Sequence, residues 1–436
     1  MNKTIELLKI AQVIPRKYFV ARKLLNADVQ KQNEFIKEIT SLANQSFEME
    51  IDLINLNDNF DFDGCFMFAN HQDNLDIYAL VHALDYPIKF VAKKELFEIP
   101  LFKTYMKLSQ SYSLDRKNAR QGVKVFKAAL RDVDKHNANV VIFPEGTRCK
   151  SPLMYEFNSG LFNIIKKVTK PLLPIHIEYD KVNFKKVKIV IGKAIKLESF
   201  ETINGVALRD LIYDEICKLK RECGRQENKY NILGLGDSIT FGENYQGEYC
   251  NGYFDKFVDR LEKEGLLASC DNLAVRGATI DDCTKSIENE EYRKLIIDSD
   301  YLIMSIGAND ILQLVKKGKV EIDDIYLSFE EMYQKTDSLI KEIIKINKNI
   351  KIILIGLYFP YPHSRVLSKF NNMKVLDLYY QKLENKYKNL RCPSIFREIE
   401  EYKDSYLPSR RNIHLSDVGY SFVVLKVIEA FQSFYK

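Results

Sequence analysis

The chain has 436 residues, of which 46% are hydrophobic and 29% are charged. This length exceeds one ordinary hydrophobic core, so two domains are expected, and the composition is that of a soluble globular protein. No apolar run approaches the roughly 18 residues of a membrane span, and the N-terminus lacks a signal-peptide core. The eight cysteines show no CxxC or His/Cys metal-binding spacing, which predicts reduced thiols in a cytoplasmic protein with no bound metal.

The formal net charge of +5 is unevenly distributed along the chain. Residues 101–200 hold 20 basic and 8 acidic side chains, whereas residues 229–436 hold 29 and 31. Such a basic field suits phosphate-bearing ligands or an anionic membrane face. Nucleic acid would also suit the charge, but no recognised nucleic-acid motif accompanies it, so no nucleic-acid partner is predicted. A solvated basic surface without a partner explains the charge equally well.

The first part of the chain predicts two helices and then an alternation of strands and helices. Residues 4–24 form an amphipathic pattern interrupted by Pro15, and residues 30–45 predict a second helix. Basic side chains after Pro15 allow the first segment either to cover its own domain or to lie in a lipid interface. Strands are then predicted at 65–69, 88–92, 111–114, 140–143 and 172–177, a hairpin at 185–191, and helices at 102–108, 119–134, 157–167 and 208–221.

A second domain is predicted over residues 229–436, separated from the first domain (residues 1–222) by a short polar linker. It starts with a buried strand at residues 230–235. Later strands are predicted at 271–274, 301–305 and 351–355, with helical stretches between them. Strands alternating with helices of this length imply right-handed crossovers and a parallel sheet, so the predicted fold class is α/β with two domains and an N-terminal helical segment.

The stretch Asn70–Asp76 places His71 five residues ahead of Asp76, between a strand and a helical pattern. On one continuous helix the two side chains would point apart, since five residues turn a helix by roughly 500°. If His71 lies in the turn and Asp76 in the first helical turn, the carboxylate can reach the imidazole. A histidine oriented in this way can take a proton from a hydroxyl. Alternatively, Asn70 and Asp73 merely cap a helix beside an incidental histidine.

Four motifs in order, with a fifth between them, resemble those of the glycerolphosphate and lysophosphatidate acyltransferase family over about residues 40–215. They are Asn70-His71-x4-Asp76, the strand end at Arg116, the run Phe143–Arg148, and Leu173-Pro174-Ile175, with Lys93-x-Glu95-Leu96-x3-Pro100 among them. The resemblance implies that His71 deprotonates an acceptor hydroxyl, which attacks an acyl thioester, and that Asp76 orients His71. The glycine that usually opens the second motif is absent, because Ser109-Gln110-Ser111 occupies that region.

The same resemblance assigns the acceptor's phosphate to a set of substrate-binding residues. These are Arg116, Glu145, Gly146, Thr147 and Arg148. The assignment is physically reasonable, because a guanidinium matches phosphate oxygens bidentately and a glycine lets backbone N–H groups approach closely. Surface ion pairing is the alternative explanation for the two arginines.

A second ordered set of motifs follows the strand at residues 230–235. Gly236-Asp237-Ser238 puts a serine hydroxyl at the carboxyl end of a parallel sheet and at a helix N-terminus, where open α/β sheets place their sites. Further along stand Gly277, the run Gly307–Asp310, and His414. An ordinary Gly- and Asx-rich loop explains any one of these but not four in sequence.

This set resembles the SGNH (GDSL-type) esterase and lipase family over residues 229–436, and it implies a flavodoxin-like three-layer α/β/α fold. By the resemblance, Ser238 is the nucleophile and His414 its base, and the oxyanion hole comprises Gly277, Asn309 and the N–H of Ser238. The family's acid usually stands three residues before the histidine, where this chain has Arg411. The pair then works as a dyad held by a main-chain carbonyl, recruits Asp404, or is weakened.

Together the two resemblances imply a bifunctional lipid-modifying enzyme with no bound cofactor. The first domain would transfer an acyl group from acyl-CoA or acyl-ACP to a lysophospholipid such as 1-acyl-glycerol-3-phosphate. The second would hydrolyse an ester or thioester, with a (lyso)phospholipid as one candidate. The alternatives are an acetyl-esterase or thioesterase, or a catalytically weakened lipid-binding domain. Peripheral contact with the anionic inner face of the cell membrane is expected, and acyl carrier protein is a further candidate partner.

Overall fold

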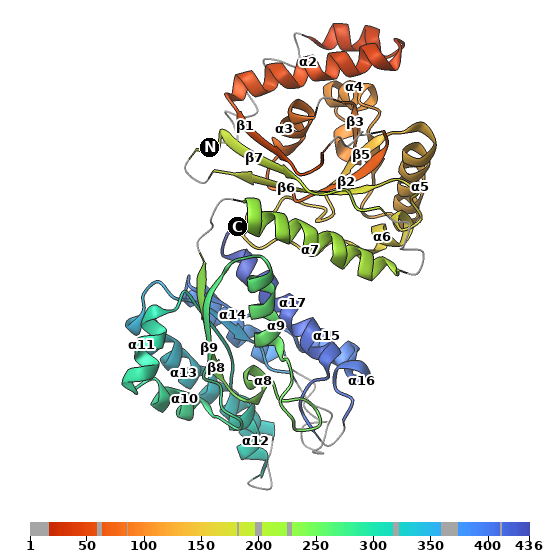
Figure 1. Cartoon of the computed structure of the whole chain (residues 1–436). Helices are drawn as coiled ribbons and strands as arrows, with labels where there is room; N and C mark the ends of the chain where they lie inside the picture. The colour runs from red at the N-terminus through yellow and green to blue at the C-terminus, as the bar shows by residue number, and fades with distance from the viewer. Residues whose placement is uncertain are drawn as a thin grey trace. The chain divides into compact units, whose positions relative to one another are not determined.

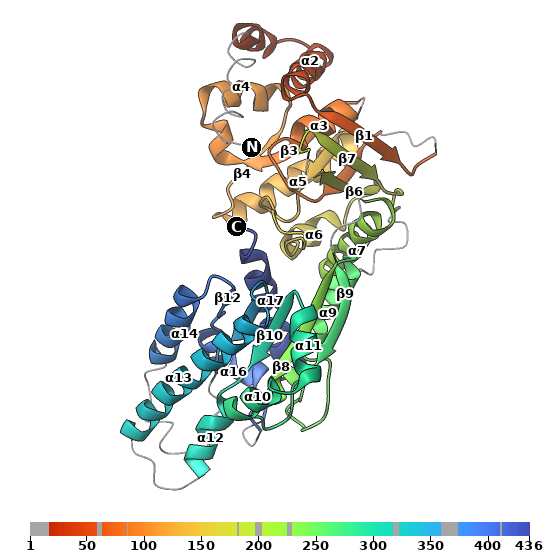
Figure 2. The ribbon, with the colours of Figure 1, turned by 90° about the vertical axis from the view of Figure 1, so that its left-hand side faces the viewer.

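The computed structural model describes residues 17–58, 63–84, 86–180, 183–196, 203–224, 229–316, 322–358, 374–409 and 412–436. The chain folds as two compact units, Met1–Gln226 and Glu227–Lys436 (Figures 1 and 2). Of the N-terminal segment predicted as an interrupted helix, residues 17–24 are helical, and Pro15 lies outside the described residues. No helix among the described residues is both long and apolar enough to cross a membrane.

The first unit contains a seven-stranded sheet in the order β1-β7-β6-β2-β5-β3-β4. Only the β6–β7 pair is antiparallel among the described strand pairs of this sheet, and it forms the predicted hairpin. The strands are β1 (Glu50–Asn55), β2 (Cys65–Ala69), β3 (Ile88–Lys93), β4 (Tyr112–Leu114), β5 (Asn139–Ile142), β6 (Leu172–Tyr179) and β7 (Lys186–Ile191). β1 was not predicted, because its exposed edge carries Glu50, Asp52 and Asn55, which are depleted in strands.

Helices cover both faces of this sheet. They are α2 (Val29–Phe47), α3 (Asp76–Ala83), α4 (Pro100–Leu108), α5 (Ala119–His136), α6 (Ser159–Ile165) and α7 (Gly205–Cys223), with the 3-10 helix η1 (Lys94–Phe97). One core packs α2 and α3 on β6 through Leu173 and Ile177, and the other packs α5, α6 and α7 on the opposite face. β6 is therefore buried along its whole length, and its carboxyl end lies beside the turn that follows β2.

The second unit contains a five-stranded, all-parallel sheet in the order β12-β11-β10-β8-β9. Its strands are β8 (Tyr230–Gly236), β9 (Leu267–Asn272), β10 (Tyr301–Ser305), β11 (Lys351–Ile355) and β12 (Leu390–Arg391). The chain reverses direction across the sheet between β8 and β10, the flavodoxin-like arrangement that places a site at that crevice. The α/β class and this parallel sheet are confirmed. β9 lies earlier than predicted, because its edge strand is mostly exposed and lacks an apolar pattern.

Helices of the second unit lie on both faces of its sheet. They are α8 (Ser238–Phe241), α9 (Tyr253–Lys263), α10 (Ile280–Ser286), α11 (Glu290–Asp298), α12 (Ala308–Lys316), α13 (Ile322–Ile346), α14 (Lys374–Lys386), α15 (Phe396–Glu401), α16 (Lys403–Tyr406) and α17 (Asp417–Ser433). α10, α13 and α14 pack into one core, and α9 contacts α17 through Phe257 and Phe431. α17 also brings the segment containing His414 to the carboxyl end of β8.

Candidate active sites

His71 and Asp76 lie at the carboxyl edge of the first sheet. His71 follows β2 in an extended turn, and Asp76 is the first residue of α3. Nδ1 of His71 is 2.7 Å from Oδ2 of Asp76, and Asp76 is completely buried. The turn therefore brings together two side chains that a continuous helix would separate.

The contacts of Asp76 fix the orientation of the imidazole. Oδ2 accepts hydrogen bonds from the backbone N–H groups of Gln72 (2.8 Å) and Asp73 (3.1 Å), and Oδ1 accepts one from the Tyr179 hydroxyl (2.7 Å). A carboxylate held by three donors remains an acceptor, so Nδ1 of His71 carries the hydrogen. Nε2 is then the basic nitrogen, and within the described part of the chain no side chain bonds to it.

Residues of the loop after β5 hydrogen-bond to both the backbone N–H and the backbone carbonyl of His71. Oε1 of buried Glu145 accepts the His71 N–H at 2.7 Å, and Oε2 accepts the Tyr155 N–H at 2.9 Å. The Cys149 N–H donates to the His71 carbonyl at 2.7 Å, and the Phe143 ring stacks on the imidazole at 4.2 Å. Glu145, expected to contact phosphate, thus has both oxygens bonded to the backbone of the site.

The other predicted substrate-binding residues lie at strand ends of the same sheet edge. Arg116 follows β4, and Gly146, Thr147 and Arg148 follow β5, which runs parallel to β2. Gly146 has φ +70°, a conformation that favours glycine, and Thr147 and Arg148 are exposed. Partial burial lowers the pKa of Arg116, and nearby Glu95 opposes that shift. Neither arginine forms an ion pair with any described residue.

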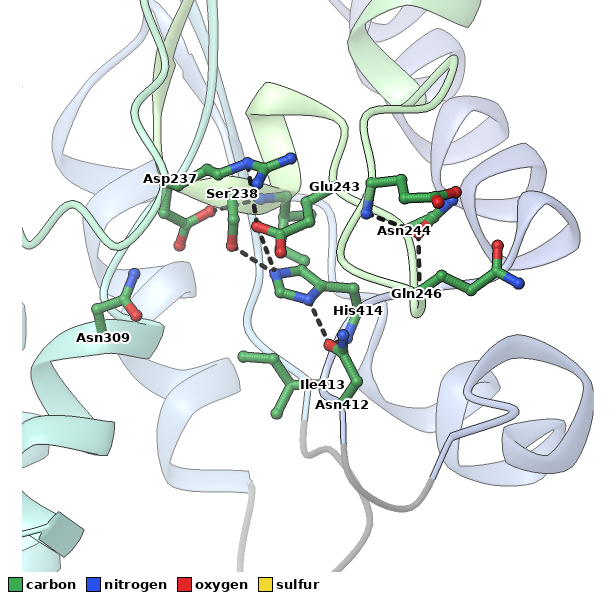
Figure 3. A network of polar contacts seen from close by, with 12 residues as sticks. Asp237, Ser238, Glu243, Asn244, Gln246, Asn309, Asn412, Ile413 and His414 are labelled. Carbon is green, nitrogen blue, oxygen red and sulfur yellow. Dashed lines mark hydrogen bonds and ion pairs between the residues drawn. The ribbon is translucent and has the colours of Figure 1, made fainter.

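In the second unit, Ser238 and His414 form a hydrogen-bonded pair (Figure 3). Ser238 begins α8 directly after β8, and its Oγ is 2.7 Å from Nε2 of His414. The turn between β8 and α8 needs a glycine at position 236. Gly236 has φ +129°, and a Cβ there would lie 2.1 Å from the Ser305 carbonyl oxygen. The serine hydroxyl is consequently held at the carboxyl end of the sheet.

Asn412 orients His414, a role that sequence reasoning did not assign to it. Its Oδ1 accepts the His414 backbone N–H at 3.1 Å and lies 2.5 Å from the ring Nδ1 (Figure 3). An oxygen that accepts a backbone N–H is the acceptor for the ring as well, so Nδ1 carries the hydrogen and Nε2 faces Ser238. Arg411 lies outside the described residues, and Asp404 sits on α16 with an exposed side chain. A side-chain amide two residues before the histidine was the available signal.

The predicted oxyanion-hole residues are placed differently from one another. Gly277 has φ +78°, and a Cβ added to it would meet no atom within 4 Å. Asn309 lies in the first turn of α12, and one of its amide hydrogens is donated to the Ala278 carbonyl at 3.0 Å. Figure 3 shows Asn309 away from His414, with Ser238 between them. A side-chain amide has a second hydrogen, so Asn309 retains one donor for a substrate oxygen.

Asp237 stabilises the turn between β8 and α8, which carries Ser238. It is 1% exposed, accepts the Ser305 hydroxyl at 2.7 Å and caps α8 through the Ile239 N–H at 3.1 Å. Burial raises its pKa to about 6. A small apolar cavity of about 60 Å³ adjoins Asp237 and Ile413, and its wall includes Ile311 and Leu376.

Two charged side chains flank His414 on the serine side. Oε2 of Glu243 is 3.5 Å from Nε2 of His414, and Nε of Arg276 is 3.5 Å from the same oxygen. Burial lowers the pKa of His414, Glu243 opposes that shift, and Arg276 adds to it. No cluster of three or more His, Cys, Asp or Glu side chains suited to a metal ion occurs among the described residues.

Two protein-family models match the chain, one in each unit. Residues 55–178 match the model described as Acyltransferase, and residues 235–422 match that of the GDSL-like Lipase/Acylhydrolase family. These matched ranges contain His71 and Asp76 in the first case and Ser238 and His414 in the second.

Individual relatives are similar to a part of the chain. A 1-acyl-sn-glycerol-3-phosphate acyltransferase of Saccharomyces cerevisiae is 32% identical over 111 residues, 25% of this chain and 37% of that protein. The uncharacterised protein YpmR of Bacillus subtilis is 26% identical over 208 residues, 46% of this chain and 80% of that protein. The crystal structure of the acyltransferase PlsC from Thermotoga maritima covers 52% of this chain and 100% of its own, with 20% identity and TM-score 0.40. The chain spans between 30% and 49% of the length of the curated 1-acyl-sn-glycerol-3-phosphate acyltransferases that it matches.

Proposed function

We propose that this chain, which joins an acyltransferase-family domain to a GDSL-like lipase domain, acylates a lysophospholipid in its first unit and hydrolyses an ester in its second. The observation that carries the proposal is common to both units. In each, one histidine has Nδ1 bonded to an oxygen acceptor, which leaves Nε2 as the base: His71 through Asp76, and His414 through Asn412. Hydroxyl deprotonation is the chemistry that both reactions require.

In the first unit, His71 removes the proton of the acceptor hydroxyl through Nε2. The hydroxyl oxygen attacks the thioester carbonyl of acyl-CoA or acyl-ACP, and the thiol leaves with the proton carried by the imidazolium. Asp76 stabilises the imidazolium, because its buried carboxylate lies 2.7 Å from Nδ1. Glu145 holds the backbone of His71 and therefore acts as a positioning residue.

Arg116, Thr147, Arg148 and the backbone at Gly146 bind the phosphate of the acceptor in this proposal. Support comes from the shared sheet edge, the exposure of the residues after β5 and the arginines' lack of described ion-pair partners. The relatives named 1-acyl-sn-glycerol-3-phosphate acyltransferases favour 1-acyl-glycerol-3-phosphate as that acceptor. Acyl carrier protein is a candidate donor, and the proposed location is cytoplasmic, at the inner face of the cell membrane.

In the second unit, His414 takes the proton of Ser238, Oγ attacks the ester carbonyl, and the alcohol leaves with the proton from His414 to give an acyl-enzyme. Water then attacks with the same histidine as base and releases the acid. The backbone N–H groups of Ser238 and Gly277 and the remaining amide hydrogen of Asn309 stabilise the oxyanion. The 2.7 Å serine–histidine contact favours this active dyad over a domain that only binds lipid.

The two activities are separated by paired variants. His71→Ala should abolish transfer of radiolabelled acyl groups to 1-acyl-glycerol-3-phosphate and leave ester hydrolysis intact, and Ser238→Ala should do the converse. His136→Ala, at the exposed end of α5, is the matched control and should change neither. Undiminished acyl transfer by His71→Ala overturns the first assignment, and absence of fluorophosphonate labelling at Ser238 overturns the second.

The acetyl-esterase or thioesterase alternative for the second unit takes the small apolar cavity, which is lined by the sequence neighbours Asp237 and Ile413 of the two catalytic residues, as the acyl site. Its volume of about 60 Å³ is well below the roughly 150 Å³ that accommodates benzene in an engineered core cavity, and leaves room for a few methylene groups. A panel of p-nitrophenyl esters measures the preference. Leu376→Phe, which fills the cavity from α14, should shift it to shorter esters, whereas exposed Leu378→Phe on the same helix should not. Preference for long-chain esters in both proteins contradicts the cavity's role.

A further inference from the structure

Among the residues that the structure describes, the group bonded to Nδ1 of His414 is the Asn412 side chain rather than a carboxylate. Asn412 fixes the ring's tautomer there, but its amide is neutral. During attack on an ester, the imidazole becomes a cation, and an acid in the usual position stabilises that cation as well as holding the ring. An uncompensated positive charge in a largely buried site is costly, so a negative group elsewhere would assist this pair.

Glu243 lies where such a group would act. Its Oε2 is 3.5 Å from Nε2 of His414 (Figure 3). The side chain of Glu243 is 14% exposed and that of His414 is 11% exposed, so solvent screens the interaction weakly. The backbone of Glu243 is tied to the site at both ends: its N–H donates to the Ser238 carbonyl at 3.0 Å, and its carbonyl accepts the Tyr420 hydroxyl at 2.6 Å. The carboxylate is thus attached to the same rigid turn as the serine.

We propose that Glu243 supplies the negative charge that stabilises the His414 imidazolium, so that this site has its acid on the serine side of the ring. The inference rests on the proposed hydrolysis by the second unit. In the acylation step, the Oγ–H bond of Ser238 breaks, the proton moves to Nε2, and Oγ bonds to the ester carbon. The carbonyl electron pair moves to its oxygen. When the carbonyl re-forms, the bond from the carbon to the alcohol oxygen breaks and the alcohol leaves with the proton from Nε2, while the Glu243 carboxylate takes up no proton.

Arg276 sets the strength of this effect. Its Nε lies 3.5 Å from the Glu243 oxygen that faces His414, and its guanidinium stacks over the Phe241 ring at 5.0 Å. Within the described part of the chain, the charged side chains that shift the pKa of His414 are these two, and Ser238 and Asn412 are its neutral hydrogen-bond partners. Glu243 raises the pKa of His414 and Arg276 lowers it, so removing either charge should have opposite consequences.

The pH dependence of kcat/KM for a p-nitrophenyl ester tests the proposal. Neutral His414 is the active form, so the acid limb of the profile reports its pKa in the free enzyme. Glu243→Gln should lower kcat/KM about tenfold and move the acid limb about one unit to lower pH. Arg276→Gln should move the limb to higher pH, and Glu243→Asp should restore part of the lost rate. Glu248→Gln removes the same charge from the exposed end of the same loop and should leave the profile unchanged.

An NMR titration of the His414 imidazole, assigned with His414→Gln, gives a readout that does not depend on turnover. A lower midpoint in Glu243→Gln than in the unmodified chain is expected. Equal midpoints and equal acid limbs in the two proteins overturn the role of Glu243. If Ser238→Ala hydrolyses the ester at the unmodified rate, the proposed function of the unit fails instead, so the two failures are distinguished.

Discussion

At the scale of single residues, Tyr179 is the contact that most directly supports the His71–Asp76 pair. Its hydroxyl donates to Oδ1 of Asp76 at 2.7 Å, from the carboxyl end of β6. Tyr179→Phe removes the hydroxyl that donates to this buried oxygen. A hydrogen bond to a charged group contributes about 1.5–3 kcal/mol of free energy, and this contribution is lost in the variant. We expect acyl transfer to fall about tenfold, measured with radiolabelled thioester. Tyr155→Phe keeps the backbone contact to Glu145 and should retain full transfer, and equal rates in both variants contradict the role of Tyr179.

Glu145 and Arg148 should differ in which kinetic constant they change. Glu145→Gln replaces one backbone acceptor with an amide NH₂, which disturbs the position of His71 and should lower kcat about tenfold or more with little change in KM. Arg148→Ala removes a phosphate contact in our proposal and should raise KM for 1-acyl-glycerol-3-phosphate. Initial-rate kinetics against acceptor concentration separate them. A raised KM without loss of kcat in Glu145→Gln would return that residue to the phosphate site.

The residues of the two sites could be predicted from sequence to different extents. The spacing of His71 and Asp76 allowed the contact found between them, because a turn followed by a helix start has few geometries. Sequence marked Asn412 only as one of several polar side chains near His414, since the conformation of the turn decides which of them reaches Nδ1. The backbone contacts of Glu145 come from a different strand end, so no local pattern encodes them.

At the scale of an element, Asp237 makes the start of α8 sensitive to pH. Its pKa is raised to about 6 in the folded chain, against about 3.9 when unfolded, so the folded state binds the proton more tightly. The sign is opposite to that of a salt-bridged carboxylate: folding is favoured below pH 4, and this contribution is lost as pH rises through 6, by about 3 kcal/mol.

Asp237→Asn keeps an oxygen acceptor for Ser305 and Ile239 but does not titrate. We therefore expect its stability relative to the unmodified chain to increase between pH 4.5 and pH 7.5. Calorimetry of the full chain, with hydrogen exchange assigned to β8 and α8, measures the difference. Asp281→Asn, a change to an acidic residue of α10 with its side chain largely exposed, is the control. A difference independent of pH would show that Asp237 is ionised across the whole range.

Elements with a strong burial pattern were predicted well, and those at sheet edges were not. β2, β5 and β6 are fully buried and appear as apolar runs in the sequence. β1 and β9 are exposed edge strands with polar residues: the alternation in β1 covers only Glu50–Leu53, and β9 has neither an apolar run nor alternation. The order of the strands in the sheet could not be predicted either. β1 pairs with β7, which lies far along the sequence, and such pairing is set by tertiary packing.

At the scale of the whole molecule, each unit carries one site, and the groups that contact the imidazole differ between the two sites. His71 has a buried carboxylate on Nδ1, whereas His414 has a neutral amide on Nδ1 and a carboxylate near Nε2. Fusion of acyl transfer with ester hydrolysis suits deacylation and reacylation of membrane lipids, and both would then act on substrates at a lipid surface. A means of binding such a surface is consequently expected in the chain.

The helix at residues 17–24 offers that contact. Phe19 and Val20 are 73% and 45% exposed, and Arg22 and Lys23 beside them are exposed too. Apolar side chains next to basic ones favour the interface of an anionic bilayer, where buried carbon and surface charge both contribute.

We expect the chain to float with vesicles containing phosphatidylglycerol and to bind them less at high salt. The double variant Phe19→Ser/Val20→Ser should bind at least about tenfold more weakly, since it loses two apolar anchors. Val206→Ser, which changes an exposed residue of α7, should bind normally. Equal flotation of the double variant would exclude this segment as the membrane contact, and equal binding to vesicles of phosphatidylcholine alone would exclude the contribution of its basic side chains.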